Sequence, residues 1–214
     1  MTRMFITLEG PEGSGKTSQI PELADHIRSL GFKVLLTREP GGTLIGDQIR
    51  SVLFSLENKA LTPRTETLLF LAARAQLVEE VIRPALAEGI VVVSDRYADA
   101  TLAYQGYGHG VDLGMLRNLL EFATGGLQPD LKILLDIDVE SGLRRKTDCG
   151  EWNRLDAYSV AFHERVRNGY RAMAKEEPGK WVVINAAQNQ ELVQADLRKA
   201  VERALLPKRS GKKD

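Results

Sequence analysis

The segment that most constrains the fold is residues 10–17, which read Gly-Pro-Glu-Gly-Ser-Gly-Lys-Thr. It matches the pattern G-x-x-x-x-G-K-[ST], whose glycines let successive backbone N–H groups turn inward around an anion. Residues 4–8 before it have the apolar pattern of a strand, and residues 16–30 after it have that of a helix. This order predicts a nucleotide phosphate site in which Lys16 reaches the β- and γ-phosphates and the Thr17 hydroxyl holds Mg²⁺.

Apolar runs and amphipathic segments alternate along the rest of the chain. Alternation of this kind predicts a parallel sheet with helices on both faces and ligands at the carboxyl ends of the strands. The predicted fold class is therefore α/β of the P-loop NTPase type, with a five-stranded parallel sheet flanked by helices. Besides the elements above, strands are expected at 33–36, 90–94, 131–137 and 181–184, and helices at 44–56, 65–88, 113–123, 139–146, 156–176 and 190–205.

Length and composition narrow the classes of protein that are possible. The 214 residues fit one domain, expected over residues 1–206 and followed by a flexible basic tail at 207–214. Lys plus Arg and Asp plus Glu both total 29, and this balance argues against a dedicated nucleic-acid binder. The single cysteine, Cys149, excludes an intrachain disulfide and a cysteine-based zinc site, which fits a reducing cytoplasm. No apolar run approaches the roughly 18–20 residues of a membrane span, and no signal peptide is expected.

The chain lacks the marks of several other nucleotide-binding classes. A GTPase carries an Asn-Lys-x-Asp string that reads guanine, whereas the nearest string here, residues 58–61, is Asn-Lys-Ala-Leu and follows no strand. Ring-forming and transport ATPases are generally longer. The many arginines downstream of the loop favour a kinase for a small anionic substrate, because such an enzyme must neutralise charge between two phosphorylated groups.

Charged and aromatic residues near the expected strand ends sharpen this prediction. Arg38 lies in a turn-forming string after the second strand. Asp95 and Arg96 follow the third strand, where the carboxylate could hold Mg²⁺ through water and the guanidinium could fork onto a phosphate. Phe70 and Arg74 share a helix face at i, i+4 spacing, so that a ring could stack on a base and a guanidinium could donate to its carbonyl. The respective alternatives are an ordinary loop, a structural ion pair and core packing.

Together these strings resemble the thymidylate kinase family, whose members transfer the γ-phosphate of ATP to dTMP. The resemblance covers about residues 4–205 and implies an ATP-dependent kinase of dTMP that uses Mg²⁺, forms a homodimer and works in the cytoplasm, with no nucleic-acid or membrane partner. It rests on Leu-Glu-Gly-Pro-Glu-Gly-Ser-Gly-Lys-Thr (8–17), Thr-Arg-Glu-Pro-Gly-Gly-Thr (37–43), Phe-Leu-Ala-Ala-Arg (70–74), Ser-Asp-Arg-Tyr (94–97) and Ala-Tyr-Gln-Gly (103–106).

The resemblance also implies roles for residues in the matching strings. Glu12 would lie near the sugar 3′-hydroxyl and the transferring phosphate, and the phosphate of dTMP would be held by Arg38, Arg50 and Arg96. The thymidine pocket would comprise Phe70 stacked on the base, Arg74 on a carbonyl, Thr101 and Gln105 over the base, and Tyr104 beside the sugar, where it selects deoxyribose. The ATP site would comprise Gly10, Pro11, Glu12, Gly13, Ser14, Gly15, Lys16, Thr17 and Arg144. The catalytic set would be Glu12, Lys16, Asp95, Arg96 and Arg154, with Thr17 and Asp95 at the metal.

A mobile lid over the triphosphate is implied at residues 147–156. Gly13 stands where some members carry an arginine, and in many bacterial members lid arginines supply that charge instead. The usual arginine-rich run is replaced here by Thr147, Asp148, Cys149 and Asn153. We therefore expect Arg154 to meet the developing charge, with Arg144 or Arg145 nearer the adenine. The alternative for Arg144 and Arg145 is a solvated helix face.

Two other functions remain open from the sequence. One is a kinase of another pyrimidine nucleotide or of a deoxynucleoside, which would share the phosphate loop and an Asp-Arg pair. The other is a nucleotide-binding regulator without turnover, in which the arginines of the acceptor site would have no purpose. The pairs Phe70/Arg74 and Thr101/Gln105 favour dTMP over the first of these alternatives.

Overall fold

A computed structural model describes residues 3–148, 150 and 152–206 of the chain. The predicted tail at 207–214, and positions 149 and 151 of the predicted lid, lie outside the described residues. No helix within the described ranges combines the length and the apolar character that crossing a membrane requires.

The described residues contain one five-stranded sheet in the order β2–β3–β1–β4–β5, and each adjacent pair is parallel. This confirms the predicted α/β class. The strands are β1 (Met4–Glu9), β2 (Val34–Arg38), β3 (Val91–Asp95), β4 (Leu131–Asp136) and β5 (Trp181–Asn185). Each begins and ends within two residues of its predicted bounds. β-Branched runs such as residues 91–93 suit the middle of the sheet, because strands there are covered on both faces.

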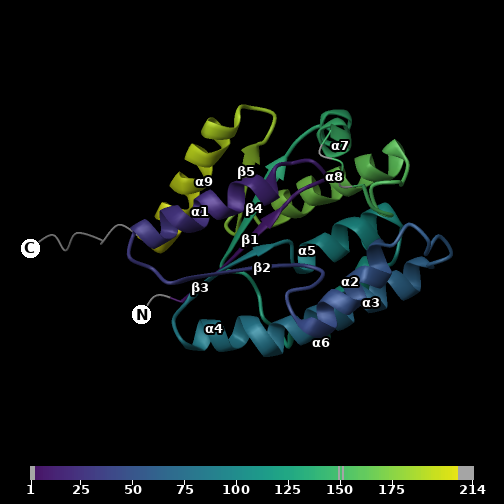
Figure 1. Ribbon diagram of the computed structural model, residues 1–214, viewed down its shortest axis with the longest axis horizontal. Helices are drawn as coiled ribbons and strands as arrows, with labels where there is room; N and C mark the ends of the chain where they lie inside the picture. The colour runs from purple at the N-terminus through teal and green to yellow at the C-terminus, as the bar shows by residue number, and fades with distance from the viewer. Residues whose placement is uncertain (1–2, 149, 151, 207–214) are drawn as a thin grey trace, which may run out of the picture.

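Helices cover both faces of the sheet (Figure 1). On one face, α1 (Lys16–Ser29) and α9 (Gln190–Leu205) pack leucine, isoleucine and valine side chains against Ile6, Val91 and Ile133. On the other face, Phe5, Val92 and Leu134 pack in one core with α3 (Pro63–Leu77), α6 (Leu113–Thr124) and α8 (Val160–Glu176). α2 (Leu44–Phe54) packs on α3, and α7 (Val139–Asp148) follows β4.

The helix predicted at 65–88 is three consecutive segments. α3 begins at Pro63, because the Thr62 hydroxyl accepts from the backbone N–H of Thr65 and a proline suits the first helical turn. A π-helical segment, η1 (Val78–Ile82), and α4 (Arg83–Ala87) follow. Pro84 has no N–H for a regular i→i−4 hydrogen bond, which accounts for the irregular hydrogen bonding just before it.

The helical stretch formed by α5 (Ala98–Thr101) and η2 (Leu102–Gly108) was not predicted from the sequence. Nearly all of its side chains are buried, so it lacks the polar face that makes a helix visible as an amphipathic pattern. The helix predicted from residue 156 begins instead at Val160, because Ser159 caps it by accepting from the N–H of Phe162.

The topology determines where a ligand can bind. β1 lies between β3 and β4, so the crossovers leave β1 on opposite sides and open a crevice at its carboxyl end. The loops that follow β1, β2 and β3 meet at that edge. They carry Lys16, Glu39 and Arg96, respectively, which brings three distant parts of the sequence to one place.

Candidate functional site

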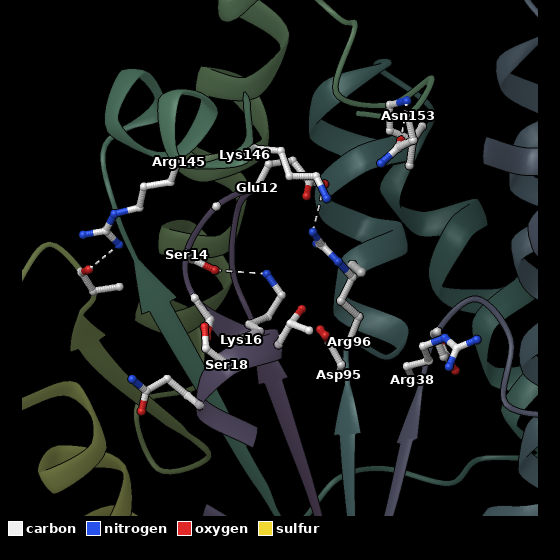
Figure 2. A pocket seen from close by; sticks show the side chains of 18 of the residues that line it. Glu12, Ser14, Lys16, Ser18, Arg38, Asp95, Arg96, Arg145, Lys146 and Asn153 are labelled. Atoms are coloured by element: carbon white, nitrogen blue, oxygen red, sulfur yellow. Dashed lines mark hydrogen bonds and ion pairs between the residues drawn. The ribbon is translucent and has the colours of Figure 1, made fainter. Parts of the chain in front are cut away.

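A cavity of about 730 Å³ lies at this edge of the sheet. Its walls come from the loop after β1, the turn after β2, the ends of β3 and η2, and the region after α7 (Figure 2). Of the predicted site residues, those that line it are Glu12, Gly13, Ser14, Gly15, Lys16, Thr17, Arg38, Arg50, Phe70, Asp95, Arg96, Thr101, Tyr104 and Gln105. Gly10, Pro11, Arg74, Arg144 and Arg154 are not among the lining residues.

The loop before α1 has the backbone shape of an anion site. Gly13 and Gly15 take φ values of 66° and 90°, which only glycine adopts easily, and Gly15 is the residue that precedes the helix. Lys16 Nζ donates to Gly10 O at 3.0 Å, to Pro11 O at 3.1 Å and to Ser14 Oγ at 3.0 Å. The lysine is therefore held directly over the loop. Burial, and then the positive charge of Arg96, lower the pKa of Lys16 to about 8.

Arg96 lies at the centre of the site. Among the residues that the structure describes, it is the one non-glycine with positive φ, at 70°. Its Nη2 donates to Glu12 Oε1 at 2.9 Å, and its Nη1 donates to Gly10 O at 3.0 Å and Tyr170 OH at 3.3 Å. The unusual backbone conformation thus accompanies a guanidinium that bridges the phosphate loop and the crevice.

Glu12 connects the phosphate loop to Arg96, after β3, and to Tyr104, on η2. It accepts from Arg96 and also from Tyr104 OH, at 2.8 Å. Burial raises the pKa of Glu12, but the charges of Arg96 and Lys16 and the tyrosine hydroxyl outweigh it and leave the pKa at about 2. Glu12 is therefore a carboxylate at neutral pH, and burial keeps the pKa of Tyr104 well above its ordinary value.

Two more arginines form the wall opposite the loop. Arg38 Nη2 lies 3.2 Å from Asp47 Oδ1, and both side chains are about half exposed. Arg50 Nη1 donates to Pro40 O at 2.9 Å, and its guanidinium lies over the ring of Phe54. Burial and the nearby charge of Arg38 lower the pKa of Arg50. With Arg96, these side chains place three cations around one part of the cavity, which suits a phosphate group.

The expected base pocket is only partly as predicted. Phe70, Thr101 and Gln105 line the cavity, whereas Arg74 is 1% exposed and lies behind them. Arg74 Nη1 donates to Thr101 Oγ1 at 2.9 Å, and its Nε donates to Glu39 Oε2 at 2.8 Å. In this structure Arg74 therefore holds the Thr101 side chain through a hydrogen bond and does not reach the cavity itself. The contact of Arg74 with a base stays a prediction.

Asp95 and Thr17 are suitable oxygen ligands for Mg²⁺. Asp95 Oδ1 is buried and has no hydrogen-bond partner among the described residues. Such an unsatisfied carboxylate oxygen beside the loop fits a hard cation. No group of three or more His, Cys, Asp or Glu side chains within the described ranges could hold a metal by itself. An ion here would therefore take its other ligands from phosphates and water.

The cations that α7 brings to the cavity are only partly the predicted ones. Of the pair Arg144 and Arg145, it is Arg145 that lines the cavity, and its Nη1 donates to Ala186 O at 3.0 Å. Lys146 lines the cavity as well. Arg154 is buried, donates to Leu53 O and forms an ion pair with Glu66 on α3. Sequence reasoning missed Lys146. The only local signal was its position one turn after Gly142, on a helix that touches the loop.

Gly13 and Gly142 make that contact. A Cβ on Gly13 would overlap the carbonyl oxygen of Gly142, and a Cβ on Gly142 would overlap the carbonyl oxygen of Glu12. The loop and α7 therefore meet backbone to backbone. This contact explains why position 13 carries no arginine, since α7 occupies the space that a side chain would need.

Comparisons with known proteins agree with this geometry. The sequence model of the family described as thymidylate kinase matches residues 8–197. A thymidylate kinase of Roseiflexus castenholzii is 49% identical over 212 residues, with 93% of each chain covered, and one of Thermomicrobium roseum is 53% identical over 190 residues, with 88% of this chain and 90% of that one covered. A crystal structure of thymidylate kinase from Ehrlichia chaffeensis is similar with a TM-score of 0.77 at 32% identity, covering 94% of this chain and 99% of that chain. The match spans the phosphate loop, the arginine wall and α7 alike, and the chain belongs to the thymidylate kinase family.

Proposed function

We infer that this protein is a thymidylate kinase that transfers the γ-phosphate of ATP to dTMP, giving dTDP and ADP. The observation that carries this function is one cavity that joins a triphosphate loop to a wall formed by Arg38, Arg50 and Arg96. A donor and an acceptor that both carry phosphates can then lie in line. Family membership supports the same reaction, and nothing favours a different pyrimidine nucleotide, a deoxynucleoside or a non-catalytic role.

The proposed reaction needs little covalent chemistry from the protein. A phosphate oxygen of dTMP is already an anionic nucleophile, so no general base is required. The loop N–H groups and Lys16 would hold the β- and γ-phosphates, and the arginine wall would hold the acceptor phosphate. Positioning and charge neutralisation would then supply most of the rate.

Glu12 and Tyr104 would position the acceptor sugar. Glu12 remains ionised, holds Arg96 and accepts from Tyr104, so the three side chains form one unit beside the loop. This arrangement supports the proposed place of Glu12 near the sugar 3′-hydroxyl. It also supports the proposed place of the Tyr104 ring next to the 2′ position, where a ribose hydroxyl would lack space.

Thr17 and Asp95 would hold Mg²⁺. When bound, the ion would neutralise charge on the phosphates that the loop already positions. Asp95 supplies a buried carboxylate oxygen that has no partner among the described residues, and Thr17 lies in the first turn of α1, next to the loop. These two side chains also leave room for water and phosphate ligands, which Mg²⁺ prefers to keep.

The positive charge on the lid side is assigned to Arg145 and Lys146. Both line the cavity from the end of α7, and Lys146 helps to lower the pKa of Glu12. Arg154 was the expected group, but its guanidinium is committed to Glu66, Tyr158 and Leu53. A role for Arg154 at the transferring phosphoryl group therefore has no support in this geometry.

A homodimer is proposed on the face formed by α2, α3 and α6. These helices pack side by side (Figure 1). They expose Leu44, Leu68 and Phe122, of which Phe122 is 88% exposed. Large apolar side chains this exposed on neighbouring helices are typical of an interface. A cytoplasmic location is proposed because both substrates are nucleotides of the cytoplasm.

A coupled ADP-release assay on a panel of acceptors tests the function directly. We expect turnover with dTMP, and much lower kcat/KM with CMP, UMP and thymidine. Lys16→Ala should abolish turnover, because the triphosphate loses its main cationic partner. Wild-type kcat in Lys16→Ala, or a panel that favours another acceptor over dTMP, would refute the proposal.

A further inference from the structure

Glu66 is a buried carboxylate that no step of the proposed reaction uses. It lies in the first turn of α3, its side chain is 0% exposed, and it is not among the residues that line the cavity. Burying an ionised carboxylate is costly unless donors surround it. Around Glu66 the donors are present, and they hold its pKa below the ordinary value although burial raises it. The group is therefore a buried anion at neutral pH.

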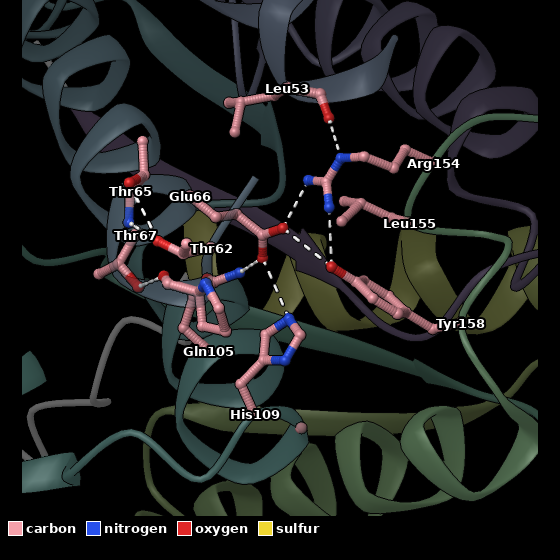
Figure 3. A network of polar contacts seen from close by, with 12 residues as sticks. Leu53, Thr62, Thr65, Glu66, Thr67, Gln105, His109, Arg154, Leu155 and Tyr158 are labelled. Atoms are coloured by element: carbon pink, nitrogen blue, oxygen red, sulfur yellow. Dashed lines mark hydrogen bonds and ion pairs between the residues drawn. The ribbon is translucent and has the colours of Figure 1, made fainter. Parts of the chain in front are cut away.

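Four side chains from two other parts of the sequence converge on Glu66 (Figure 3). Gln105 Nε2 donates to Oε1 at 2.8 Å, and His109 Nε2 lies 3.4 Å from the same oxygen. Arg154 Nη2 and Tyr158 OH donate to Oε2, the latter at 3.1 Å. Both oxygens of Glu66 are thus occupied, one toward η2 and one toward the segment after α7.

The contact with Gln105 determines which end of its amide is available to a ligand. Gln105 lines the cavity where the base of the acceptor is proposed to lie. Because its NH₂ group donates to Glu66, the amide oxygen is the group left for a ligand. An acceptor in that place pairs with a base that has N–H at N3, such as thymine or uracil. Cytosine presents a lone pair at N3 and would be repelled.

The contact between Glu66 and Arg154 positions a second part of the cavity wall, the segment around Arg154. Arg154 Nε donates to Leu53 O at 2.8 Å, and Nη1 donates to Tyr158 OH at 2.7 Å. Asn153 and Leu155, on either side of Arg154, line the cavity. Glu66 therefore holds the segment that carries these two residues against α2 and α3, while it orients Gln105 from the other direction.

We propose that Glu66 is a positioning residue that sets the base specificity of the acceptor site, by holding the amide oxygen of Gln105 toward the cavity. The proposal rests on the proposed function and names a feature of the substrate: an N–H at N3 of a pyrimidine. The same carboxylate also anchors Arg154. This contact holds the cavity wall formed by Asn153 and Leu155 in place while the amide of Gln105 contacts the base.

The test is the ratio of kcat/KM for dTMP to that for dCMP. Glu66→Gln is nearly isosteric but can accept or donate, so the amide of Gln105 is free to turn. Because a buried hydrogen bond to a charged group is worth about 1.5–3 kcal/mol, we expect the ratio to fall about tenfold or more. The KM for dTMP should rise, and the KM for ATP should stay within about twofold of wild type.

A matched control separates this effect from the general loss of a carboxylate–arginine pair. Glu79→Gln removes such a pair, with Arg83, from the exposed helical segment that follows α3, and Glu79 does not line the cavity. It should leave both KM values and the ratio unchanged. Melting temperatures of all variants show whether each one is folded.

The outcomes are distinguishable. A folded Glu66→Gln variant that keeps the wild-type dTMP/dCMP ratio and loses only melting temperature would overturn the inference. If Glu66→Gln does not fold, Gln105→Met replaces it; a folded Gln105→Met protein with the wild-type ratio would overturn the inference as well. Failure of the wild-type protein to phosphorylate dTMP at all would instead refute the proposed function.

Discussion

At the scale of single residues, charge and burial decide what the cavity can do. Lys16 is buried, Glu12 is largely buried, and the pKa values of both are shifted in directions that follow from their neighbours. Burial and Arg96 disfavour the charged form of Lys16, while Arg96 and Lys16 together favour that of Glu12. The Arg96–Glu12 pair is thus ionised at neutral pH, whereas Lys16 loses its proton as the pH rises through about 8.

This difference predicts a pH dependence. Lys16 is charged below its pKa of about 8 and neutral above it, so the free enzyme binds the triphosphate less well as pH rises through 8. We expect kcat/KM for ATP, which reports the free enzyme, to fall by about tenfold per pH unit above that value. Steady-state kinetics between pH 6.5 and 9.5 measure it. Lys16→Arg stays charged and should lack this limb, although its overall activity will be lower. A wild-type profile that is flat up to pH 9.5 would contradict the assignment.

Residue patterns predicted part of this chemistry. The phosphate loop, Arg96 and Asp95 were visible because strand ends and a glycine string mark them locally. Arg74 lies on the same helix as Phe70, as predicted, but it does not line the cavity. Its guanidinium is instead paired with Glu39, which lies in a turn 35 residues earlier. Glu66 and Arg154 are 88 residues apart, and no local pattern shows that they meet.

At the scale of elements, α7 is the part of the molecule that links the loop to the lid side of the cavity. It begins after β4, touches the loop through Gly142, and carries Arg144 followed by Arg145 and Lys146, which lie in its last turn. Arg145 and Lys146 line the cavity, whereas Arg144 does not.

This geometry predicts unequal effects of neighbouring substitutions. Lys146→Met should lower kcat by about tenfold to a hundredfold, because a cation near developing phosphoryl charge is removed while the methylene chain is kept. Arg144→Met, one position before Arg145, should have a much smaller effect. Single-turnover rates at saturating ATP and dTMP measure the chemical step for both variants. A larger loss in Arg144→Met than in Lys146→Met would show that the cation over the phosphates was assigned to the wrong residue.

Helices and strands were predicted from the sequence where they have a clear apolar or amphipathic pattern. The strands were found within two residues, since apolar runs between polar loops identify buried parallel strands. The stretch from α5 through η2 was not found, because a helix buried on all sides has no amphipathic pattern. It carries Thr101, Tyr104 and Gln105, so those residues were identified only through the family resemblance.

At the scale of the whole molecule, the sheet divides the protein into two unequal sides. α1 and α9 cover one face, while the other face carries the thicker layer that ends in α2, α3 and α6 (Figure 1). The exposed apolar residues Leu44, Leu68 and Phe122 belong to that layer and do not line the cavity. An interface formed by them would therefore leave the cavity open.

The proposed homodimer gives a direct prediction. The protein should elute at twice its chain mass of 23.7 kDa in size-exclusion chromatography with light scattering. Phe122→Glu combined with Leu68→Glu should shift it toward the monomer, because two charges would be buried in an apolar interface. Leu192→Glu, on α9 at the opposite side of the sheet and similarly exposed, is the matched control and should remain dimeric. A monomeric wild-type protein at micromolar concentration would rule out the proposed interface.

The contact between Gly13 and Gly142 has a mechanical consequence. Backbone meets backbone there, so no side chain can absorb a displacement between the loop and α7. A change in loop shape when a triphosphate enters is therefore transmitted to the end of α7, where Arg145 and Lys146 lie. Binding of the donor nucleotide and the position of the end of α7 would then be coupled. We therefore expect a substitution that enlarges either glycine to displace α7 as well as to weaken the binding of ATP.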